Sequence, residues 1–480
     1  MSKLVAAFAL ALGAASLTDE GLRREVNRLV AAVSAARHLP YTGTLRAHAV
    51  TREEASRSVL LAVGEGAAGA TQRAEGEILK RLGLLPAEAD AGGRAAQAYG
   101  FAASPRPRYD AASRSLLVPD FIPFEAQRTE VAHEVAHAVA DQRFGLRKLL
   151  EIAPDGTSRL EGDARRARLA LVEGDAMLTG LELADPRETF LGAHELGALA
   201  GRLRGSAEEG APTWFGALGE FTHVDGLLFV ARVRAHRPWS AVDALWAEPP
   251  ASSEQVLHPE KYDACEAPLP VDAAALPALA GFGPPATSDV LGELVVRTWL
   301  ATAVSPEIAW RAAAGWGGDR VGLYAATPAA ANADGGATTT AAPSTAATAT
   351  AAPTTAATTT TAPLAWITLW DDPAEADDFA RAARQVLAKL SNATSGAASG
   401  TPAPDDDGDQ TVLASPRGAY ALARRGDAVA LLLGAPEPAP AALQAMLEAV
   451  RPRASRRAAP HPRRGAQPGC PRRDRAAGPP

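Results

Sequence analysis

The chain has 480 residues, which is enough for one large domain or for two or three of ordinary size. Hydrophobic residues make up 47% of the chain and aromatic residues only 5%, so we expect a largely helical core in which leucine, valine and eight tryptophans are the large side chains. The formal net charge of −7 excludes a nucleic-acid-binding footprint for the chain as a whole, and we expect no nucleic-acid partner.

The N-terminal residues 1–16 have the layout of a secretory signal peptide. Lys3 precedes an apolar run from Leu4 to Leu12, and small residues follow at 13–16. This run is too short to cross a bilayer permanently, and no later segment reaches that length without charges. A frayed helix or a misplaced start codon is the alternative. We therefore expect an exported protein, periplasmic or extracellular, without a stable transmembrane anchor.

Residues 17–326 are predicted to be rich in helix. From Thr18 to about residue 84 the pattern is mostly helical, and Thr51 followed by Glu54 is typical of a capping box. The segment "SLLVP" (115–119) predicts a short strand just before an Ala/Val-rich helix. A second long helix is expected at 160–183, and glycines near 315–318 are expected to form a turn before another strand.

The composition changes abruptly at residues 327–363, which are almost all Ala, Thr and Pro. This tract has no large apolar side chain that could offset the entropy lost on ordering, so we predict it to be disordered. The segments before it ("DRVGLYAA") and after it ("LAWITLW") both look like strands and are expected to pair across it. The tract is then an insertion in one domain, and an interdomain linker is the alternative.

Residues 364–450 are predicted to complete that domain. A strand is followed by a helix, by a polar loop, by the hairpin "GAYALARRGDAVALLLG" with a Gly-Asp turn, and by a final helix. Together with the strand before the tract, these elements form a C-terminal ββαββα-like portion. The basic Arg/Pro-rich tail at 451–480 is expected to be disordered.

The segment "TEVAHEVAHAVADQ" (129–142) carries a polar stripe on an otherwise apolar helix. At 3.6 residues per turn the stripe contains Glu130, His133, Glu134, His137 and Asp141. A solvated helix face normally carries Lys and Arg, but this stripe has no base other than the two histidines. We therefore expect a helix that is buried on most sides and turns its polar stripe towards a cleft.

The spacing of the two histidines suits zinc. With only two cysteines in the chain, a metal must be bound by histidine and carboxylate groups. Side chains at i and i+4 project in parallel, so His133 and His137 can reach one ion at about 2.0–2.1 Å. Glu134 is placed to meet the activated water and to act as general base. The alternative is two partly buried histidines that are hydrogen-bonded to the backbone.

A catalytic zinc site needs a third protein ligand, and Glu173 is the candidate. It stands in the apolar helical run "LALVEGDAML", where a carboxylate is costly to bury unless it is paired or bound to metal. Gly174 is expected to let this helix approach the histidine helix, and Asp175 to accept a hydrogen bond from a ligand histidine. Exposed helix residues are the alternative for both acids.

Candidates for stabilising the oxyanion of the reaction are His223, His258 and Tyr262, with a structural loop as the equal alternative for the last two. The strand "SLLVP" is expected to be an edge strand that an extended substrate can join, with an ordinary hairpin strand as the alternative. The remaining histidines are interpreted as structural or solvated; they are His38, His48, His194, His236 and His461.

The motif "HEVAH" (133–137) followed by "VEGDA" (172–176) resembles the gluzincin class of zinc metallopeptidases, in which a glutamate from a second helix completes a His-Glu-x-x-His site. More narrowly, the chain resembles a bacterial group of exported zinc metallopeptidases with little established substrate chemistry. The matching pieces span roughly residues 109–450 and include "YDAASRSLLVP", "AHEVAHAVADQRF", "FTHVDGLLFVARV", "PPASSEQVLHPEKY", "GWGGDRVGLY" and "WITLWDDPAEADDFARAA".

This resemblance implies an α+β, zincin-like fold with a helix-rich catalytic region at 17–326 and a small mixed or antiparallel sheet. Carried over position by position, it implies His133, His137 and Glu173 as metal ligands and Glu134 as base. The Ala/Thr tract, the segment "AVADQRF" and the basic tail depart from the group's pattern, but none of these touches the four site residues.

The expected function is zinc-dependent hydrolysis of a peptide or protein substrate, with one catalytic Zn²⁺ ion and Glu134 as base. The rival is a zincin-like binding or scaffold protein of the cell envelope whose zinc is structural. Glu134 argues against this rival because a structural site needs no base. Hydrolysis of a non-peptide amide is a further alternative, and the sequence leaves the cleavage specificity and the oligomeric state open.

Overall fold

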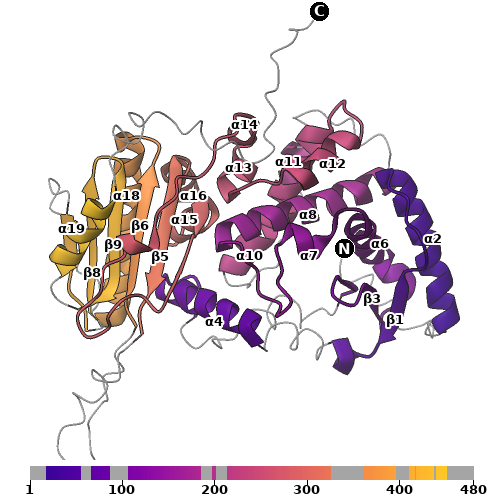
Figure 1. Cartoon of the computed structure of the whole chain (residues 1–480), viewed down its shortest axis with the longest axis horizontal. Helices are drawn as coiled ribbons and strands as arrows, with labels where there is room; N and C mark the ends of the chain where they lie inside the picture. The colour runs from indigo at the N-terminus through magenta and orange to yellow at the C-terminus, as the bar shows by residue number, and fades with distance from the viewer. Residues whose placement is uncertain are drawn as a thin grey trace, which may run out of the picture.

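The computed structural model describes residues 18–55, 66–86, 106–184, 197–201, 213–325, 362–395, 410–416, 418–436 and 439–450. The expected signal peptide, the basic tail and all but the last two residues of the Ala/Thr tract lie outside these ranges. The described chain is α+β, as predicted. A six-stranded antiparallel sheet stands at one end, and a helical half with a three-stranded sheet stands at the other (Figure 1).

The helices, in chain order, are α2 (Asp19–Arg37), α4 (Gly66–Arg81), α6 (Phe124–Phe144), α7 (Leu146–Leu149), α8 (Gly162–Ala184), α10 (Thr213–Gly219), the π-helix η3 (Glu220–Asp225), α11 (Gly226–Arg234), α12 (Ser240–Ala247), α13 (Ser253–Leu257), α14 (Pro259–Asp263), the 3₁₀-helix η4 (Ala273–Ala275), α15 (Gly292–Leu300), α16 (Pro306–Ala313), α18 (Pro373–Ser395) and α19 (Ala439–Ala449). The predicted helices at 129–142 and 160–183 are therefore present as parts of α6 and α8. None of the described helices is long and apolar enough to cross a membrane.

The strands are β1 (Arg46–Val50), β2 (Arg108–Asp110), β3 (Ser115–Pro119), β4 (Thr287–Asp289), β5 (Trp316–Leu323), β6 (Leu364–Trp370), β7 (Gln410–Leu413), β8 (Ala419–Arg425) and β9 (Ala428–Ala435). The small mixed sheet that was expected is the three-stranded one, and the C-terminal portion belongs to a second, six-stranded antiparallel sheet. The C-terminal portion also has one strand more than the predicted ββαββα order, because β7 lies between α18 and β8.

The large sheet has the strand order β4-β5-β6-β9-β8-β7. Strands β5 and β6 pair antiparallel from Trp316↔Trp370 to Leu323↔Leu364, which confirms the predicted pairing across the Ala/Thr tract. The predicted hairpin is also present as β8 and β9, with Gly426 at a positive φ in its turn. Gly317 and Gly318 lie inside β5 and not in a preceding turn. A Cβ at Gly318 would overlap the backbone of Leu269, which explains the glycine there.

Strand β6 is buried along its whole length because helices cover both faces of the large sheet. Its alternate side chains enter two different cores. Trp366 and Trp370 pack with α15 and α18, whereas Ile367 and Leu369 pack with α19. Figure 1 shows α19 on one side of the sheet and α15 and α16 on the other.

The three-stranded sheet has the order β1-β3-β2, with β1 parallel and β2 antiparallel to β3. The prediction that "SLLVP" is an edge strand is therefore wrong, because β1 occupies the side of β3 that would have been free. The strand at the edge beside α6 is β2. The described residues of the segment 18–84 are mostly helical, as predicted, and β1 is the exception.

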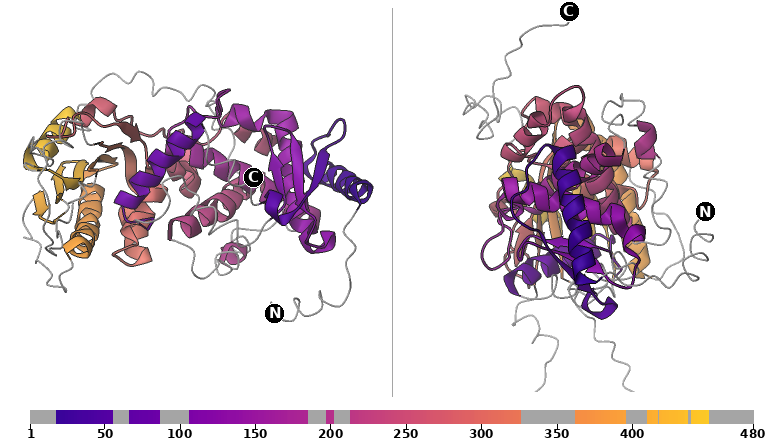
Figure 2. Two further views of the ribbon diagram at one scale, coloured as in Figure 1. Left: turned by 90° about the horizontal axis from the view of Figure 1, so that it is seen from below. Right: turned by 90° about the vertical axis from the view of Figure 1, so that its right-hand side faces the viewer.

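Helices α6 and α8 form the centre of the helical half. Val131, Val135 and Val139 on α6 are buried in a core that also contains residues of α2 and β3. Helix α2 closes this core from outside and lies across the end of the molecule in the right-hand view of Figure 2. With its apolar faces covered in this way, α6 turns its polar stripe towards α8.

Candidate metal centre

Helix α6 places His133 and His137 one turn apart on its polar stripe. The apolar positions bury the helix against α2 and β3, and Gly145 ends it with a positive φ. Along the stripe, Glu130 is exposed, His133 is half-buried, and His137 and Asp141 are buried. The stripe therefore runs from solvent into the interior, as the sequence predicted for a helix that lines a cleft.

Helix α8 presents Glu173 to the two histidines. Its neighbour Gly174 permits a close approach of helices, but the partner is α11 and not the histidine helix. A Cβ at Gly174 would overlap the backbone of Gly226, and a Cβ at Gly226 would overlap the backbone of Ala170. The expected approach to α6 through Gly174 is therefore corrected: the glycine pair brings η3 and α11 against α8, beside Glu173.

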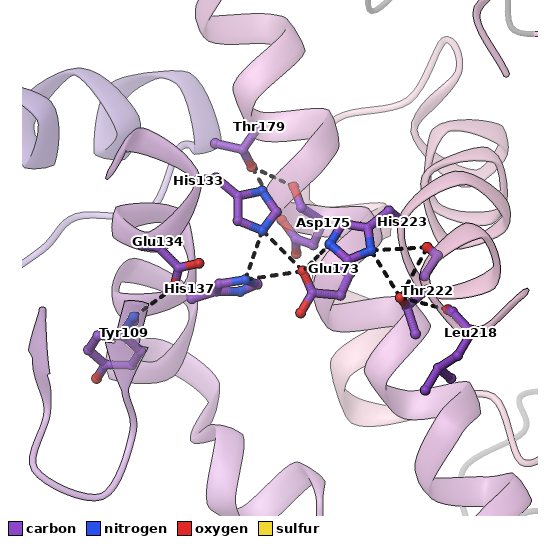
Figure 3. Close-up of polar contacts among 11 residues, drawn as sticks. Tyr109, His133, Glu134, His137, Glu173, Asp175, Thr179, Leu218, Thr222 and His223 are labelled. Carbon is purple, nitrogen blue, oxygen red and sulfur yellow. Dashed lines mark hydrogen bonds and ion pairs between the residues drawn. The ribbon is translucent and has the colours of Figure 1, made fainter. Parts of the chain in front are cut away.

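The three predicted ligands meet at one point (Figure 3). The Nε2 atom of His133 lies 3.1 Å from Nε2 of His137 and 3.0 Å from Oε2 of Glu173. Nε2 of His137 lies 3.3 Å from the same carboxylate oxygen. The three donor atoms thus form a nearly equilateral triangle, although their side chains come from two helices.

The triangle fits a tetrahedral zinc ion. Such an ion, with ligand distances of about 2.0–2.1 Å, holds its ligand atoms about 3.3–3.4 Å apart, which is close to the observed edges. Two imidazoles and one carboxylate are also the ligand types of catalytic zinc sites, which keep a fourth position for water. The donor atoms of these three side chains all lie within 4.8 Å of one another. No other His, Cys, Asp or Glu of the described residues belongs to this group.

The charges of the cluster depend on one another. Burial lowers the pKa of His137, but the carboxylate of Glu173 outweighs burial and raises that pKa to about 9. Burial likewise acts to raise the pKa of Glu173, yet the two histidines hold it well below its usual value. The carboxylate is therefore ionised, and a positive charge at His137 is favoured.

Glu134 lies beside the triangle but outside it. Its Oε2 atom accepts a hydrogen bond of 2.6 Å from the backbone N–H of Tyr109 on β2. Figure 3 shows one of its carboxylate oxygens joined to the backbone N–H of Tyr109. This bond holds the carboxylate beside the cluster, where its charge also acts on His137.

Tyr109 is a site residue that the sequence analysis missed. Its hydroxyl donates a 2.7 Å hydrogen bond to Asp141, whose other carboxylate oxygen accepts the N–H of Leu146. These bonds attach β2 to the C-terminal half of α6. Tyr109 contacts Glu134 through its backbone N–H. The identity of its side chain therefore does not predict this contact.

Asp175 does not have the expected partner. Its carboxylate accepts two hydrogen bonds from Arg37, of 2.7 and 2.9 Å, and one of 2.7 Å from Nε1 of Trp246. Among the described residues no hydrogen bond joins it to His133 or His137. Asp175 and both of its partners are buried, so this carboxylate holds α2, α8 and α12 together beneath the cluster.

Of the three candidates for oxyanion stabilisation, His223 lies at the cluster. Its Nε2 atom is 3.5 Å from Oε2 of Glu173, and its side chain is 47% exposed. It stands on η3, and π-helical turns are frequent at functional sites. Nδ1 lies 3.1 Å from the carbonyl oxygen of Gly219. Nδ1 also lies 3.0 Å from the hydroxyl of Thr222, which can donate to it, so the neutral imidazole can carry its proton on Nε2.

His258 and Tyr262 lie in a structural network elsewhere. Nε2 of His258 is 2.9 Å from the buried carboxylate of Glu293, and the hydroxyl of Tyr262 donates to the carbonyl of Glu248 over 2.6 Å. These contacts agree with the alternative of a structural loop. Nearby, a second cluster of acids surrounds the ammonium of Lys261; it consists of Glu254, Glu266 and Asp371.

Comparison with known families gives one match. The model of a domain of unknown function (DUF8575) matches residues 281–447, from before β4 into α19 and on both sides of the Ala/Thr tract. Comparison with curated proteins and with solved structures found no match. The matched range contains none of the metal-binding candidates, so the chemistry of the site rests on its own geometry.

Proposed function

We propose that the protein is a zinc-dependent peptidase of the gluzincin type, and that the helical half is its catalytic region. The triangle formed by His133, His137 and Glu173, with Glu134 fixed beside it, is the observation that supports this proposal. A site built only to hold zinc has four protein ligands and no use for a neighbouring carboxylate.

In this proposal His133, His137 and Glu173 hold one zinc ion. When bound, zinc supplies a Lewis acid that lowers the pKa of water to near 7 and polarises the carbonyl of the substrate. Glu134 takes a proton from the attacking water and later delivers it to the leaving amine. The bond from Tyr109 N–H to Glu134 keeps this carboxylate in position. His223 donates from Nε2 to the developing oxyanion.

The substrate is proposed to be an extended peptide that lies along β2. This strand, and not β3, forms the edge of the small sheet beside α6, and its Tyr109 amide points to Glu134. An extended chain at this edge brings its backbone past the cluster. The proposal also includes export, which rests on the sequence layout of residues 1–16.

Cleavage of a broad peptide library by zinc-loaded protein tests the function. We expect wild type to cleave, and Glu134→Gln to bind zinc with unchanged stoichiometry while cleaving roughly 10²–10⁴-fold more slowly, because the general base is lost. Glu130→Gln, an exposed glutamate one turn earlier on α6, is the matched control and should behave like wild type. If both wild type and Glu134→Gln bind zinc and neither cleaves, a scaffold function replaces the enzyme.

A further inference from the structure

A cavity of about 570 Å³ opens at the C-terminal end of α6, where α7, the first half of α8 and α12 meet. This volume lies within the range of small-molecule sites, roughly 300–1,000 Å³. None of its lining residues is a predicted metal ligand. Phe144 in its wall follows His137 by seven residues, or about 10 Å along the helix, so the cavity is a neighbour of the metal centre and not part of it.

One part of the cavity wall is apolar and aromatic, and charged side chains line the rest. The rings of Phe144 and Trp246 stack with their centroids 4.8 Å apart and an interplanar angle of 14°, and Leu149 continues this surface. The indole N–H of Trp246 is already bonded to Asp175. Trp246 therefore offers the cavity an apolar ring and no hydrogen-bond donor, which favours a ligand with an apolar body.

The charges that line the cavity are unbalanced. Arg168 is paired with Glu151 at 3.0 Å, and Asp243 is paired with Arg37 at 2.8 Å. Arg143 and Lys148 are exposed, and no ion pair within the described part of the chain involves either of them.

The remaining acid in the lining is Glu248, which leaves two cations facing one carboxylate. An excess of one positive charge beside an apolar wall attracts a singly charged anion. A carboxylate suits it better than a doubly charged phosphate, and the planar guanidinium of Arg143 can bind a carboxylate through two parallel hydrogen bonds.

We propose that this cavity binds an apolar monocarboxylate, with the carboxylate at Arg143 and Lys148 and the apolar body against Phe144 and Trp246. Such a ligand is either a small free acid or the C-terminal residue of a peptide. The binding site is separate from the metal centre and does not depend on the proposed hydrolysis.

Calorimetric titration of the full-length protein with N-acetylphenylalanine and with N-acetylphenylalaninamide tests the charge requirement. The two probes differ only in the carboxylate, so we expect the acid to bind about tenfold or more tightly than the amide. N-acetylglycine, which lacks the apolar body, should bind more weakly than N-acetylphenylalanine. Equal affinity for acid and amide, or no binding of either, would overturn the proposal.

A double substitution locates the bound acid. Arg143→Gln with Lys148→Gln removes both unpaired cations from exposed positions, and glutamine is compatible with helix. We expect affinity for the acid to fall about tenfold or more. Arg24→Gln with Arg28→Gln on α2 removes the same number of exposed charges and should leave affinity unchanged. Melting curves verify that each variant is folded, and unchanged binding in the cavity variant would refute the assignment.

Titrations with and without zinc separate this cavity from the metal centre. The cavity should bind the acid equally in both cases, whereas binding that requires zinc and ignores the double substitution would contradict the proposal. A tetrapeptide acid and its amide then distinguish the two sources of the ligand. If the acid binds more tightly than the amide in both pairs of probes, the cavity binds a peptide C-terminus. If this holds only for N-acetylphenylalanine and its amide, the cavity binds a small free acid.

Discussion

The ionised carboxylate of Glu173 is stabilised inside the protein by the histidines that face it. Without metal, the two histidines supply this stabilisation, and the carboxylate raises the pKa of His137 in return. In the proposed zinc-bound protein the ion would take over this role and displace the proton of His137, because histidine binds metal only in its neutral form. The same side chains would then hold either a proton or a metal.

Substitution of His223 distinguishes a role in catalysis from a role as a metal ligand. If it stabilises the oxyanion, His223→Gln should lower kcat by roughly 10²–10³-fold and leave zinc stoichiometry and affinity unchanged. Steady-state kinetics and zinc titration of the same preparation measure both quantities. His48→Gln, at an exposed position on β1, is the control. A loss of zinc affinity in His223→Gln would instead make His223 a fourth ligand.

The ligand residues are predictable from local sequence, but their surroundings are not. The i, i+4 spacing of His133 and His137, and a carboxylate within an apolar helix at Glu173, are signals that a short window contains. The bond from Tyr109 to Glu134 uses a backbone N–H, which every residue but proline offers. The partner of Asp175 is Arg37, 138 residues away, and no local pattern joins them.

At the scale of elements, the crossing of α8 with η3 and α11 determines where His223 lies relative to Glu173. The helices touch through Gly174 and Gly226, with no room for a Cβ at either residue. This contact is closer than side chains normally allow, and it brings the histidine of η3 within 3.5 Å of the carboxylate on α8. A shift of this crossing would move His223 away from the cluster.

Two substitutions within α8 test this contact. Gly174→Ala should destabilise the fold by about 2–3 kcal/mol, because the new methyl group overlaps the backbone of Gly226. Gly180→Ala, later in the same helix and with open space around it, should stabilise by about 0.5–1 kcal/mol through helix propensity. Thermal unfolding of both variants gives the comparison. Similar melting temperatures for the two would show that the close contact does not form.

Strands with few buried side chains were not predicted from the sequence, whereas strands with many buried side chains were. The segments "LAWITLW" and "SLLVP" are apolar and are found as β6 and β3. Strands β1 and β7 have only exposed and half-buried positions and no buried one, so neither has a continuous apolar run. The position of β3 inside its sheet depends on β1, because strand order follows from long-range pairing and not from local sequence.

At the scale of the whole molecule, buried carboxylates join the helical half to the large sheet. Asp163, in the first turn of α8, accepts the N–H of Ser253 where α13 begins. Asp319 on β5 accepts the N–H groups of Leu291 and Gly292 where α15 begins. These bonds connect segments that are far apart in the chain. Local sequence can indicate where a helix begins. It does not indicate that the first residues of α8, α13 and α15 meet at one junction, which contains Asp163 and Asp319.

The junction makes stability depend on pH. Burial raises the pKa of Asp163 to about 7 from an ordinary value of 3.8, despite the opposing charge of Arg166. The folded state therefore holds a proton there that the unfolded state loses above about pH 4. Stability contributed by this group is complete at low pH and is lost as the pH rises through about 7.

Asp163→Asn removes this titration while keeping the shape of the side chain. The stability of wild type minus that of the variant should fall by on the order of 2–4 kcal/mol between about pH 4 and pH 8. Melting temperatures measured across this range, with the exposed Asp120→Asn as control, give the difference. A difference that is the same at every pH would mean that Asp163 is not protonated in the folded protein.

Zinc binding by Glu173→Ala is the most direct test of the central claim, that one ion is held by His133, His137 and Glu173. Competition with a zinc-binding dye gives stoichiometry and affinity for wild type, for Glu173→Ala and for the exposed control Glu130→Ala. We predict one zinc per chain in wild type and control, and an affinity more than about 100-fold weaker in Glu173→Ala. Unchanged stoichiometry and affinity in Glu173→Ala would contradict the claim and remove Glu173 from the metal centre.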